Sequence, residues 1–237
     1  MIMKKNSKIV PLLIFILLLF GMAIFPYIPL AILRININDL SQTTKVIYNF
    51  FCDIIFMIIV FFVFKDDMIR DFKSYLKGFI KNFEVSFKYY FVGLIIMIAS
   101  NLMIALCFKG ASANNEEAVR NLINLYPLYM IFSVAIYAPF IEETIFRKCI
   151  KNFILSFGNN KITKNIYISL SGLIFALMHI VGMANSVLDY LYVIPYLSLG
   201  ASFAALYYKT DNIFSSIVMH SMHNTAAVLL YLALGIV

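Results

Sequence analysis

The chain has 237 residues, of which 62% are hydrophobic and only 13% are charged. Soluble domains average about half apolar and about one quarter charged residues, so this composition excludes an ordinary soluble domain. Long apolar runs recur along the whole sequence, which is typical of a helical membrane protein and unlike the short alternating segments of a transmembrane β-barrel. We therefore predict an all-α fold, a polytopic transmembrane helical bundle.

Seven apolar segments are candidate spans: Ile9–Leu33, Val46–Phe64, Tyr89–Phe108, Tyr126–Phe146, Ile166–Val181, Val187–Tyr207 and Ile213–Ile236. The first follows a basic start and resembles a signal peptide, but it is about twice too long and no small-residue cleavage site closes it. We expect an uncleaved span that Pro26 and Pro29 kink or end. The whole chain, 1–237, is predicted to be a single transmembrane domain.

The formal charge of +7 reflects basic residues that flank the apolar runs, as membrane orientation requires, and no nucleic-acid partner is expected. Most of them fall in alternate loops: Lys4, Lys5, Lys8; Lys65, Arg70, Lys73, Lys77, Lys81, Lys88; Arg147, Lys148, Lys151, Lys161, Lys164; Lys209. The other side keeps Arg34, Lys45, Lys109 and Arg120. The N-terminus is therefore predicted to be cytoplasmic. Residues 65–88 also have helical apolar spacing, which predicts an amphipathic cytoplasmic helix touching the lipid bilayer.

Several polar and sulfur-bearing side chains in the spans have an ordinary interpretation. Cys52, Cys107 and Cys149 show no paired spacing, so we expect buried apolar thiols rather than disulfides or a metal site. Asp53 and Asp189 lie near span ends and are expected to be solvated or paired.

Glu142 and Glu143 are adjacent acids inside an apolar stretch, where ionisable groups are costly and usually functional. Neighbours on a helix point about 100° apart, so the two carboxylates should have different roles. Glu143 and Arg147 are four residues apart and are predicted to form an ion pair. Glu142 would then be free to act as a base.

The histidines lie in the last three spans. Phe175 and His179 share one helical face, as do His220 and Asn224, while His223 points elsewhere and is expected to be a bystander. A glutamate, two histidines and an asparagine from three helices could surround one water molecule. Two alternatives remain: histidines that only bond a neighbouring helix, and a proton relay of a transporter, which the lack of an inverted repeat disfavours.

These residues form three ordered motifs: Glu142-Glu143-x-x-x-Arg147, Phe175-x-x-x-His179 and His220-x-x-x-Asn224. In this order, within apolar segments, they resemble the CPBP intramembrane proteases, a family that comprises CAAX proteases and bacteriocin-processing enzymes and is also called Abi. The resemblance covers a core at 125–230, whereas the spans at 1–110 carry no motif.

The resemblance implies hydrolysis of a peptide bond without a covalent intermediate. Glu142, helped by His179, would activate water, and His220 and Asn224 would form the oxyanion site. Glu143, Arg147 and Phe175 would support them. No cofactor is expected, although Glu142, His179 and His220 could instead bind Zn²⁺ with an open position for water.

The depths of the motifs constrain the fourth span. Lys164 lies fifteen residues before His179, about 22 Å along a helix, whereas Arg147 is only five residues beyond Glu142. We therefore expect the fourth helix to continue to about Leu155, with Arg147 buried against Glu143. Lys148 and Lys151 would then snorkel to the interface.

The leading hypothesis is thus an intramembrane endopeptidase acting on a peptide or membrane-protein substrate. Abundant Ile, Asn, Lys and Phe suggest an AT-rich coding sequence and a bacterial cell membrane, where peptide maturation, bacteriocin immunity or signalling cleavage are the expected roles. The alternative is a non-enzymatic immunity or scaffold protein that keeps the fold. The sequence does not determine the substrate, the cleavage site or the oligomeric state.

Overall fold

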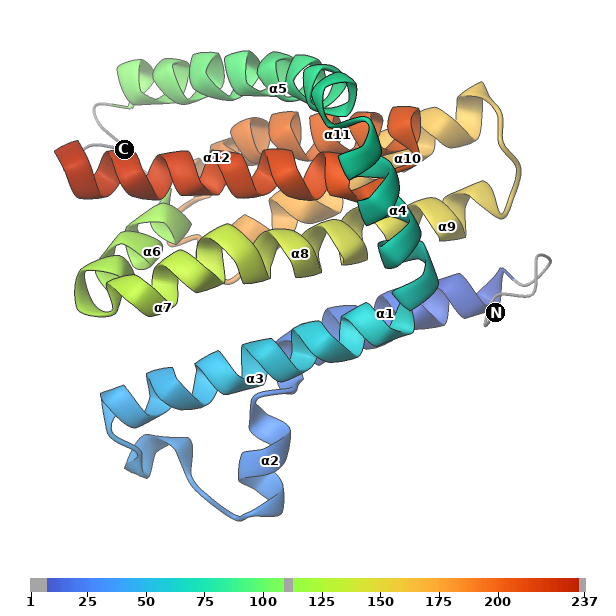
Figure 1. Ribbon diagram of the computed structural model, residues 1–237. Coiled ribbons are helices and arrows are strands. Elements are labelled where there is room, and N and C mark those ends of the chain that lie inside the picture. Colours follow the sequence, from blue (N-terminus) through green and yellow to red (C-terminus); the bar gives the residue numbers. More distant parts are fainter. Residues whose placement is uncertain (1–7, 109–112, 235–237) are drawn as a thin grey trace.

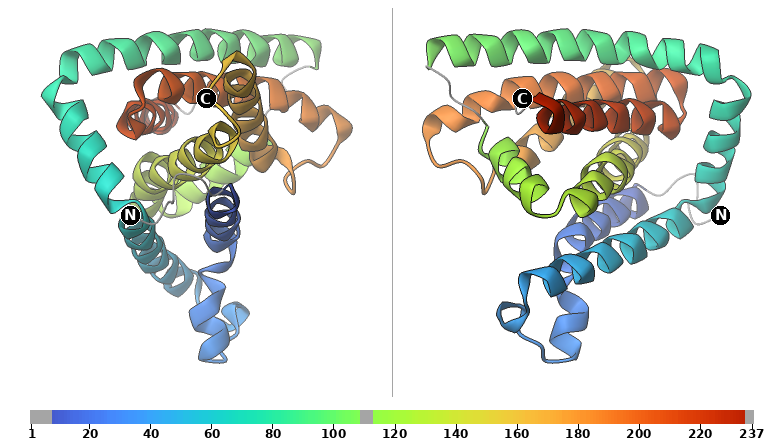
Figure 2. Two further views of the ribbon diagram at one scale, coloured as in Figure 1. Left: turned by 90° about the vertical axis from the view of Figure 1, so that its right-hand side faces the viewer. Right: turned by 60° about the vertical axis from the view of Figure 1, so that its left-hand side comes forward.

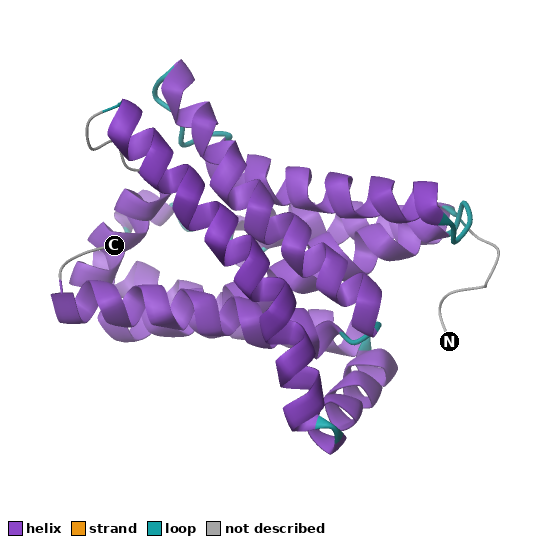
Figure 3. Cartoon of the chain, turned by 90° about the horizontal axis from the view of Figure 1, so that it is seen from above, coloured by secondary structure: helices purple, strands orange, loops and turns teal. Residues whose placement is uncertain are grey.

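The computed structural model describes residues 8–108 and 113–234, and this part of the chain is helical without a β-strand (Figure 1). Lys4, Lys5, Lys109 and the last residues of the seventh predicted span lie outside the described residues. Seen from above, the helices form one bundle joined by short loops (Figure 3). The predicted all-α class is confirmed.

The N-terminal elements are α1 (Ile9–Ile24), α2 (Tyr27–Ile32), the short 3₁₀ turn η1 (Ile37–Asp39), α3 (Gln42–Val63), α4 (Lys65–Lys77) and α5 (Phe79–Cys107). The first predicted span ends at Ile24, just before Pro26, as its prolines suggested. Ser41 caps α3 by accepting a hydrogen bond of 3.1 Å from the backbone of Thr44. Helices α3, α4 and α5 form an open frame on one side of the C-terminal helices, while α2 projects beyond α3 (Figures 1 and 2).

The amphipathic helix predicted over 65–88 is interrupted. Gly78 separates α4 from α5, and residues 79–88 are the first turns of the long apolar α5 rather than part of a surface helix. Glycine is the least helix-favouring residue other than proline, which explains why the chain turns here. Only α4 crosses the ends of the other helices, so only α4 matches the prediction (Figure 1).

The next helices are α6 (Asn114–Leu125) and a continuous helical rod of α7 (Pro127–Phe132), η2 (Ser133–Tyr137), α8 (Ala138–Glu142), η3 (Glu143–Cys149) and α9 (Ile150–Leu155). The rod therefore runs to Leu155, as the depth argument predicted. Both η2 and η3 are π-helical. Such widened turns are rare and often occur at functional sites.

The chain ends with α10 (Lys161–Ile180), η4 (Val187–Tyr192), α11 (Val193–Thr210) and α12 (Ile213–Leu234). Helices α10 and α11 cross closely because Gly172 lies against the backbone of Ala201, where an added Cβ would come within 2.8 Å. Gly93 plays the same part between α5 and α11, facing Ser202. The glycines thus allow α10, α11 and α5 to pack tightly.

Five helical stretches are long and apolar enough to cross a membrane: Gln42–Val63, Phe79–Cys107, Pro127–Leu155, Val187–Thr210 and Ile213–Leu234. The other two predicted spans correspond to α1, a shorter apolar helix of 16 residues, and to α10, which has 20 residues. A count of about seven is compatible with this architecture. The protein is an integral membrane protein.

The structure shows the surroundings of the two aspartates near span ends and of the three cysteines. Asp53 accepts a hydrogen bond of 3.1 Å from the Tyr129 hydroxyl, which confirms that it is paired. Asp189 is likewise paired, at 3.0 Å from the Asn114 amide. All three cysteines are free, but Cys107 is exposed, contrary to prediction, because it ends α5 on an outward face.

The predicted snorkelling of Lys148 and Lys151 is wrong. Both side chains are buried, because Lys148 pairs with Asp67 at 2.8 Å and Lys151 pairs with Asp211 at 2.6 Å. These carboxylates lie far away in the sequence, so helical spacing could not reveal them.

Candidate active site

A cavity of about 450 Å³ lies between the rod, α5, α6, α10, α11 and α12. All four residues predicted to be catalytic line it, together with Phe175: Glu142, His179, His220 and Asn224. The structure therefore brings residues of all three motifs together around one cavity. The rest of the wall is largely apolar, with Met97, Met178, Leu199 and Phe203 among its residues.

The two glutamates are separated as their angular positions predict. Glu143 is fully buried, and its Oε2 lies 3.0 Å from Nε of the equally buried Arg147. This confirms the predicted ion pair. Glu142 instead reaches the cavity, with a side chain that is 17% exposed. The carboxylate beside the water-accessible space is thus Glu142.

Glu143 has a second partner that the sequence did not reveal. Its Oε1 lies 2.9 Å from His220 Nδ1, so this one carboxylate joins Arg147 on its own helix to His220 on α12. A carboxylate paired with a guanidinium can only accept hydrogen bonds, so Nδ1 carries the hydrogen. The other ring nitrogen, Nε2, then points toward Glu142, 3.9 Å from its Oε2. His220 can donate from Nε2 only when both of its ring nitrogens carry a hydrogen.

The Arg147 guanidinium is held by aromatic rings as well as by charge. It lies 4.5 Å from the Phe175 ring centroid and 5.9 Å from that of Phe203. Its contact with Glu143 is an ion pair without hydrogen-bond geometry, and none of its nitrogens has a hydrogen-bond partner among the described residues. Cation–π contacts of a desolvated guanidinium contribute about 2 kcal/mol. Phe175 therefore supports the ion pair, in keeping with its motif position.

His179 is fixed on the opposite wall. Its Nδ1 lies 2.8 Å from the Phe175 carbonyl one turn earlier, so Nδ1–H donates and Nε2 is left with a lone pair. The ring stacks between Phe175 and Tyr196, with centroids 4.4 and 4.7 Å away. An imidazole held in this tautomer can accept a proton from water.

Asn224 is anchored by the π-helical turn of the rod. Ala138 donates to the Ser133 carbonyl five residues back, and the next residue, Pro139, has no N–H for Val134. The Val134 carbonyl accepts a hydrogen bond of 2.8 Å from Asn224 Nδ2 instead. One amide hydrogen of Asn224 is thereby fixed and the other remains available. Pro139 in the middle of an apolar span was the signal in the sequence.

The cavity has further polar residues that were not predicted to belong to the site, among them His223, which was expected to be a bystander. Glu116 and Arg120 on α6 line it and form an ion pair of 3.3 Å. Burial raises the pKa of the Glu116 carboxyl, and the charge of Arg120 only partly offsets this. His223 also lines the cavity, with Nδ1 3.3 Å from the Tyr90 hydroxyl of α5. Neither α6 nor α5 carries a motif.

A metal site would need several ligand side chains close together in the described part of the chain. No set of three or more His, Cys, Asp or Glu side chains there is grouped so that it could hold a metal ion. The alternative set Glu142, His179 and His220 shares the cavity, but His220 Nδ1 and His179 Nδ1 are already engaged in protein hydrogen bonds. Each ring keeps Nε2 as its available atom.

Part of the chain is similar to a known protein family. Residues 124–226 match the family described as type II CAAX prenyl endopeptidase Rce1-like. A protein of Bacillus subtilis (strain 168) named "Putative membrane peptidase YdiL" is 32% identical over 125 residues. The aligned part is 52% of this chain and 45% of that protein, so the chain spans less than half of that relative. No solved structure matches significantly. The resemblance drawn from the motifs is confirmed for residues 124–226.

Proposed function

Starting from the Rce1-like character of residues 124–226, we propose that the protein is an intramembrane endopeptidase that hydrolyses a peptide bond with a water activated by Glu142. The observation that carries the proposal is the convergence of Glu142, His179, His220 and Asn224 on one cavity within an otherwise apolar bundle. Buried titratable groups inside a membrane protein are costly unless they serve a function.

The geometry suggests a division of labour. Glu142 accepts one proton of a water whose oxygen bonds to the scissile carbonyl carbon, while the Nε2 lone pair of His179 accepts a hydrogen bond from the same water and orients it. The imidazolium form of His220 and the free amide hydrogen of Asn224 donate to the oxyanion. The C–N bond then breaks, and the proton held by Glu142 passes to the leaving amine. No covalent intermediate is needed.

The cavity also indicates the kind of substrate. Its walls are mainly apolar, and most of them belong to helices long and apolar enough to cross a membrane, which suits an extended apolar peptide or a segment of a membrane protein. Peptide maturation and bacteriocin immunity remain the proposed biological roles. A non-enzymatic immunity or scaffold protein is the alternative.

A cleavage assay tests the proposal. The purified protein in detergent is offered candidate peptides, and wild type is compared with Glu142→Gln and His179→Ala. Positioned acid–base groups contribute about 10²- to 10⁴-fold to rate, so each variant should lose at least about a hundredfold in kcat. Glu84→Gln is the matched control, because Glu84 is an exposed glutamate on α5. Undiminished cleavage by Glu142→Gln would refute the assignment.

Two further arms separate the alternatives. If cells that carry the Glu142→Gln variant keep their immunity to the bacteriocin, the non-enzymatic scaffold protein is favoured. Activity that a chelator abolishes and Zn²⁺ restores would favour a metal held by Glu142, His179 and His220, whereas activity unaffected by the chelator supports the glutamate mechanism.

A further inference from the structure

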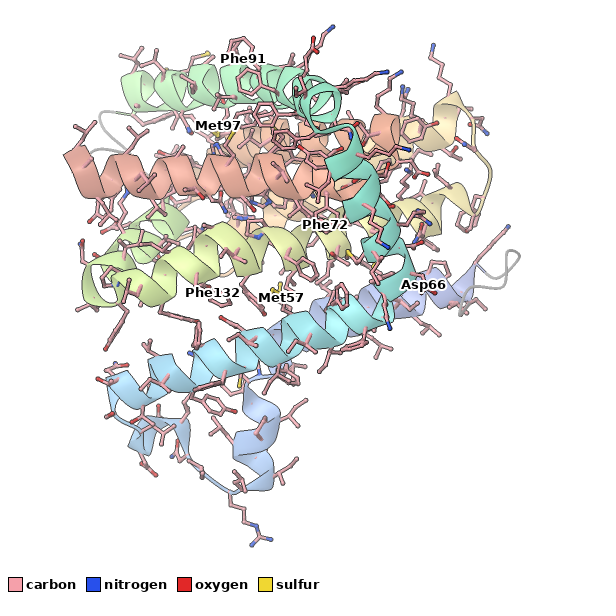
Figure 4. The ribbon with its side chains drawn as sticks, in the orientation of Figure 1. Met57, Asp66, Phe72, Phe91, Met97 and Phe132 are labelled. Carbon is pink, nitrogen blue, oxygen red and sulfur yellow. The ribbon has the colours of Figure 1, made fainter. Side chains whose placement is uncertain are left out.

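Helix α4 lies outside the Rce1-like segment, yet it contacts two helices of the site. It crosses the ends of the long helices and joins α3 to α5 (Figures 1 and 2). The side chains of Met68, Asp71 and Tyr75 are buried against the bundle. Phe72 packs on Phe214 of α12, with ring centroids 5.2 Å apart (Figure 4). The helix is therefore a part of the core packing and not only a connection.

Asp71 caps the helix that carries His220. Its Oδ2 accepts a hydrogen bond of 3.2 Å from the backbone of Ile213, the first residue of α12. Asn212 accepts 3.0 Å from Phe214 and donates 2.7 Å to the Asp71 carbonyl, which makes the contact reciprocal. Arg70 binds the other carboxylate oxygen of Asp71 at 2.8 Å. The first N–H groups of α12 are thus satisfied partly by a different helix.

Asp67 holds the helix that carries the glutamates. Its Oδ2 lies 2.8 Å from Nζ of Lys148, a lysine whose side chain is only 3% exposed. Lys148 follows Arg147 directly, so this contact fixes the rod five residues beyond Glu143. A buried ammonium without a counter-charge is strongly unfavourable, which makes the contact more than a surface ion pair.

We propose that Asp67 and Asp71 are positioning residues that set the spacing between the glutamate rod and α12. The proposal rests on the proposed peptidase function. One helix supplies both carboxylates, Asp67 for the rod and Asp71 for α12, so a shift of one helix must strain the other contact. The spacing that they hold is the one at which Glu143 Oε1 lies 2.9 Å from His220 Nδ1.

The contacts are close enough to the site to matter. His220 lies seven residues after Ile213, about 10 Å along α12. A displacement of a catalytic group by about 1 Å costs on the order of a hundredfold in rate. A rigid helix transmits an axial shift at its first turn directly to His220 and to Asn224, one turn further on.

The experiment compares Asp71→Ala, Asp71→Asn and Asp67→Asn with Asp66→Asn. Asp66 is an exposed acid on the same helix, with no hydrogen bond or ion pair among the described residues (Figure 4). Two quantities are measured on folded protein: kcat and KM for peptide cleavage, and hydrogen exchange of the backbone at residues 213–220. Asp71→Asn keeps an acceptor oxygen without the charge and serves as the conservative variant.

The expected result is a kcat lowered about tenfold or more in Asp71→Ala with KM nearly unchanged, faster exchange in α12, and partial rescue in Asp71→Asn. If Asp71→Ala does not fold, the test uses a charge swap between Asp67 and Lys148. The double variant Asp67→Lys with Lys148→Asp should then recover the kcat that is lost in Asp67→Lys alone. Values for Asp71→Ala and Asp67→Asn equal to those for Asp66→Asn would overturn the proposal. A wild type that cleaves nothing, with faster exchange in Asp71→Ala, would refute the peptidase and still support the coupling of α4 to α12.

Discussion

The substitution Glu143→Gln tests the central ion pair most directly. It keeps the size of the side chain but removes the negative charge that pairs with Arg147 in the described part of the chain, and both side chains are fully buried. A guanidinium stays protonated at any accessible pH, so the uncompensated charge cannot be relieved by titration. Breaking a buried ion pair from one side costs about 3–5 kcal/mol, and that is the loss expected here.

Two further variants are compared with Glu143→Gln to show how much of its loss of stability comes from the unpaired charge. Arg147→Met leaves the Glu143 carboxylate without its guanidinium, but a proton can neutralise this carboxylate, and His220 Nδ1 still lies 2.9 Å from its Oε1. This variant should therefore be less destabilised than Glu143→Gln. Its stability should recover as the pH falls. The double variant with both changes has no unpaired charge and should regain much of the loss, because an apolar replacement of a buried pair is often neutral.

Reversible unfolding in mixed detergent micelles measures the free energies of all four proteins, and wild type provides the reference. A Glu143→Gln variant within about 1 kcal/mol of wild type would refute the reasoning. So would a double variant no more stable than Glu143→Gln. Either result would mean that water or a rearranged side chain compensates for the charge of Arg147.

Two further predictions concern packing and pH. Gly172→Ala should destabilise the protein by about 1–3 kcal/mol, because the new Cβ meets the Ala201 backbone at 2.8 Å, whereas Gly78→Ala, which meets only a flexible side chain, should cost less in the same unfolding assay. Burial alone would raise the pKa of Asp67, but its hydrogen bond to Lys148 and nearby positive charges outweigh this and lower it. Its contribution to stability is therefore present above about pH 3.9 and lost as the pH falls through the depressed value. The difference in unfolding free energy between wild type and Asp67→Asn should vanish in acid, and a difference that persists there would contradict the assignment.

Local patterns in the sequence were sufficient for the class of protein and for the principal ion pair. Hydropathy depends on composition along a single segment, so it identified a helical membrane protein. The pairing of Glu143 with Arg147 depends on one turn of one helix, and the structure confirms it at 3.0 Å. The extension of the rod to Leu155 followed from helical rise together with the similar depths expected for Glu142 and His179.

Two of the predictions that failed did so for different reasons. Lys148 and Lys151 were expected to snorkel because their partners, Asp67 and Asp211, are remote in the sequence. The amphipathic stretch at 65–88 was read as one helix because apolar spacing continues across Gly78, although the chain turns there to begin α5.

The sequence alone thus determined the membrane-protein class, the motifs and the ion pair of Glu143 with Arg147 within one helical turn. Only the tertiary structure decided that Glu143 also holds His220, that the Val134 carbonyl anchors Asn224, and that Asp71 caps α12. These contacts join residues 77, 90 and 142 positions apart. Helical periodicity specifies which face a side chain occupies, but the partner on the neighbouring helix is fixed only when the helices pack.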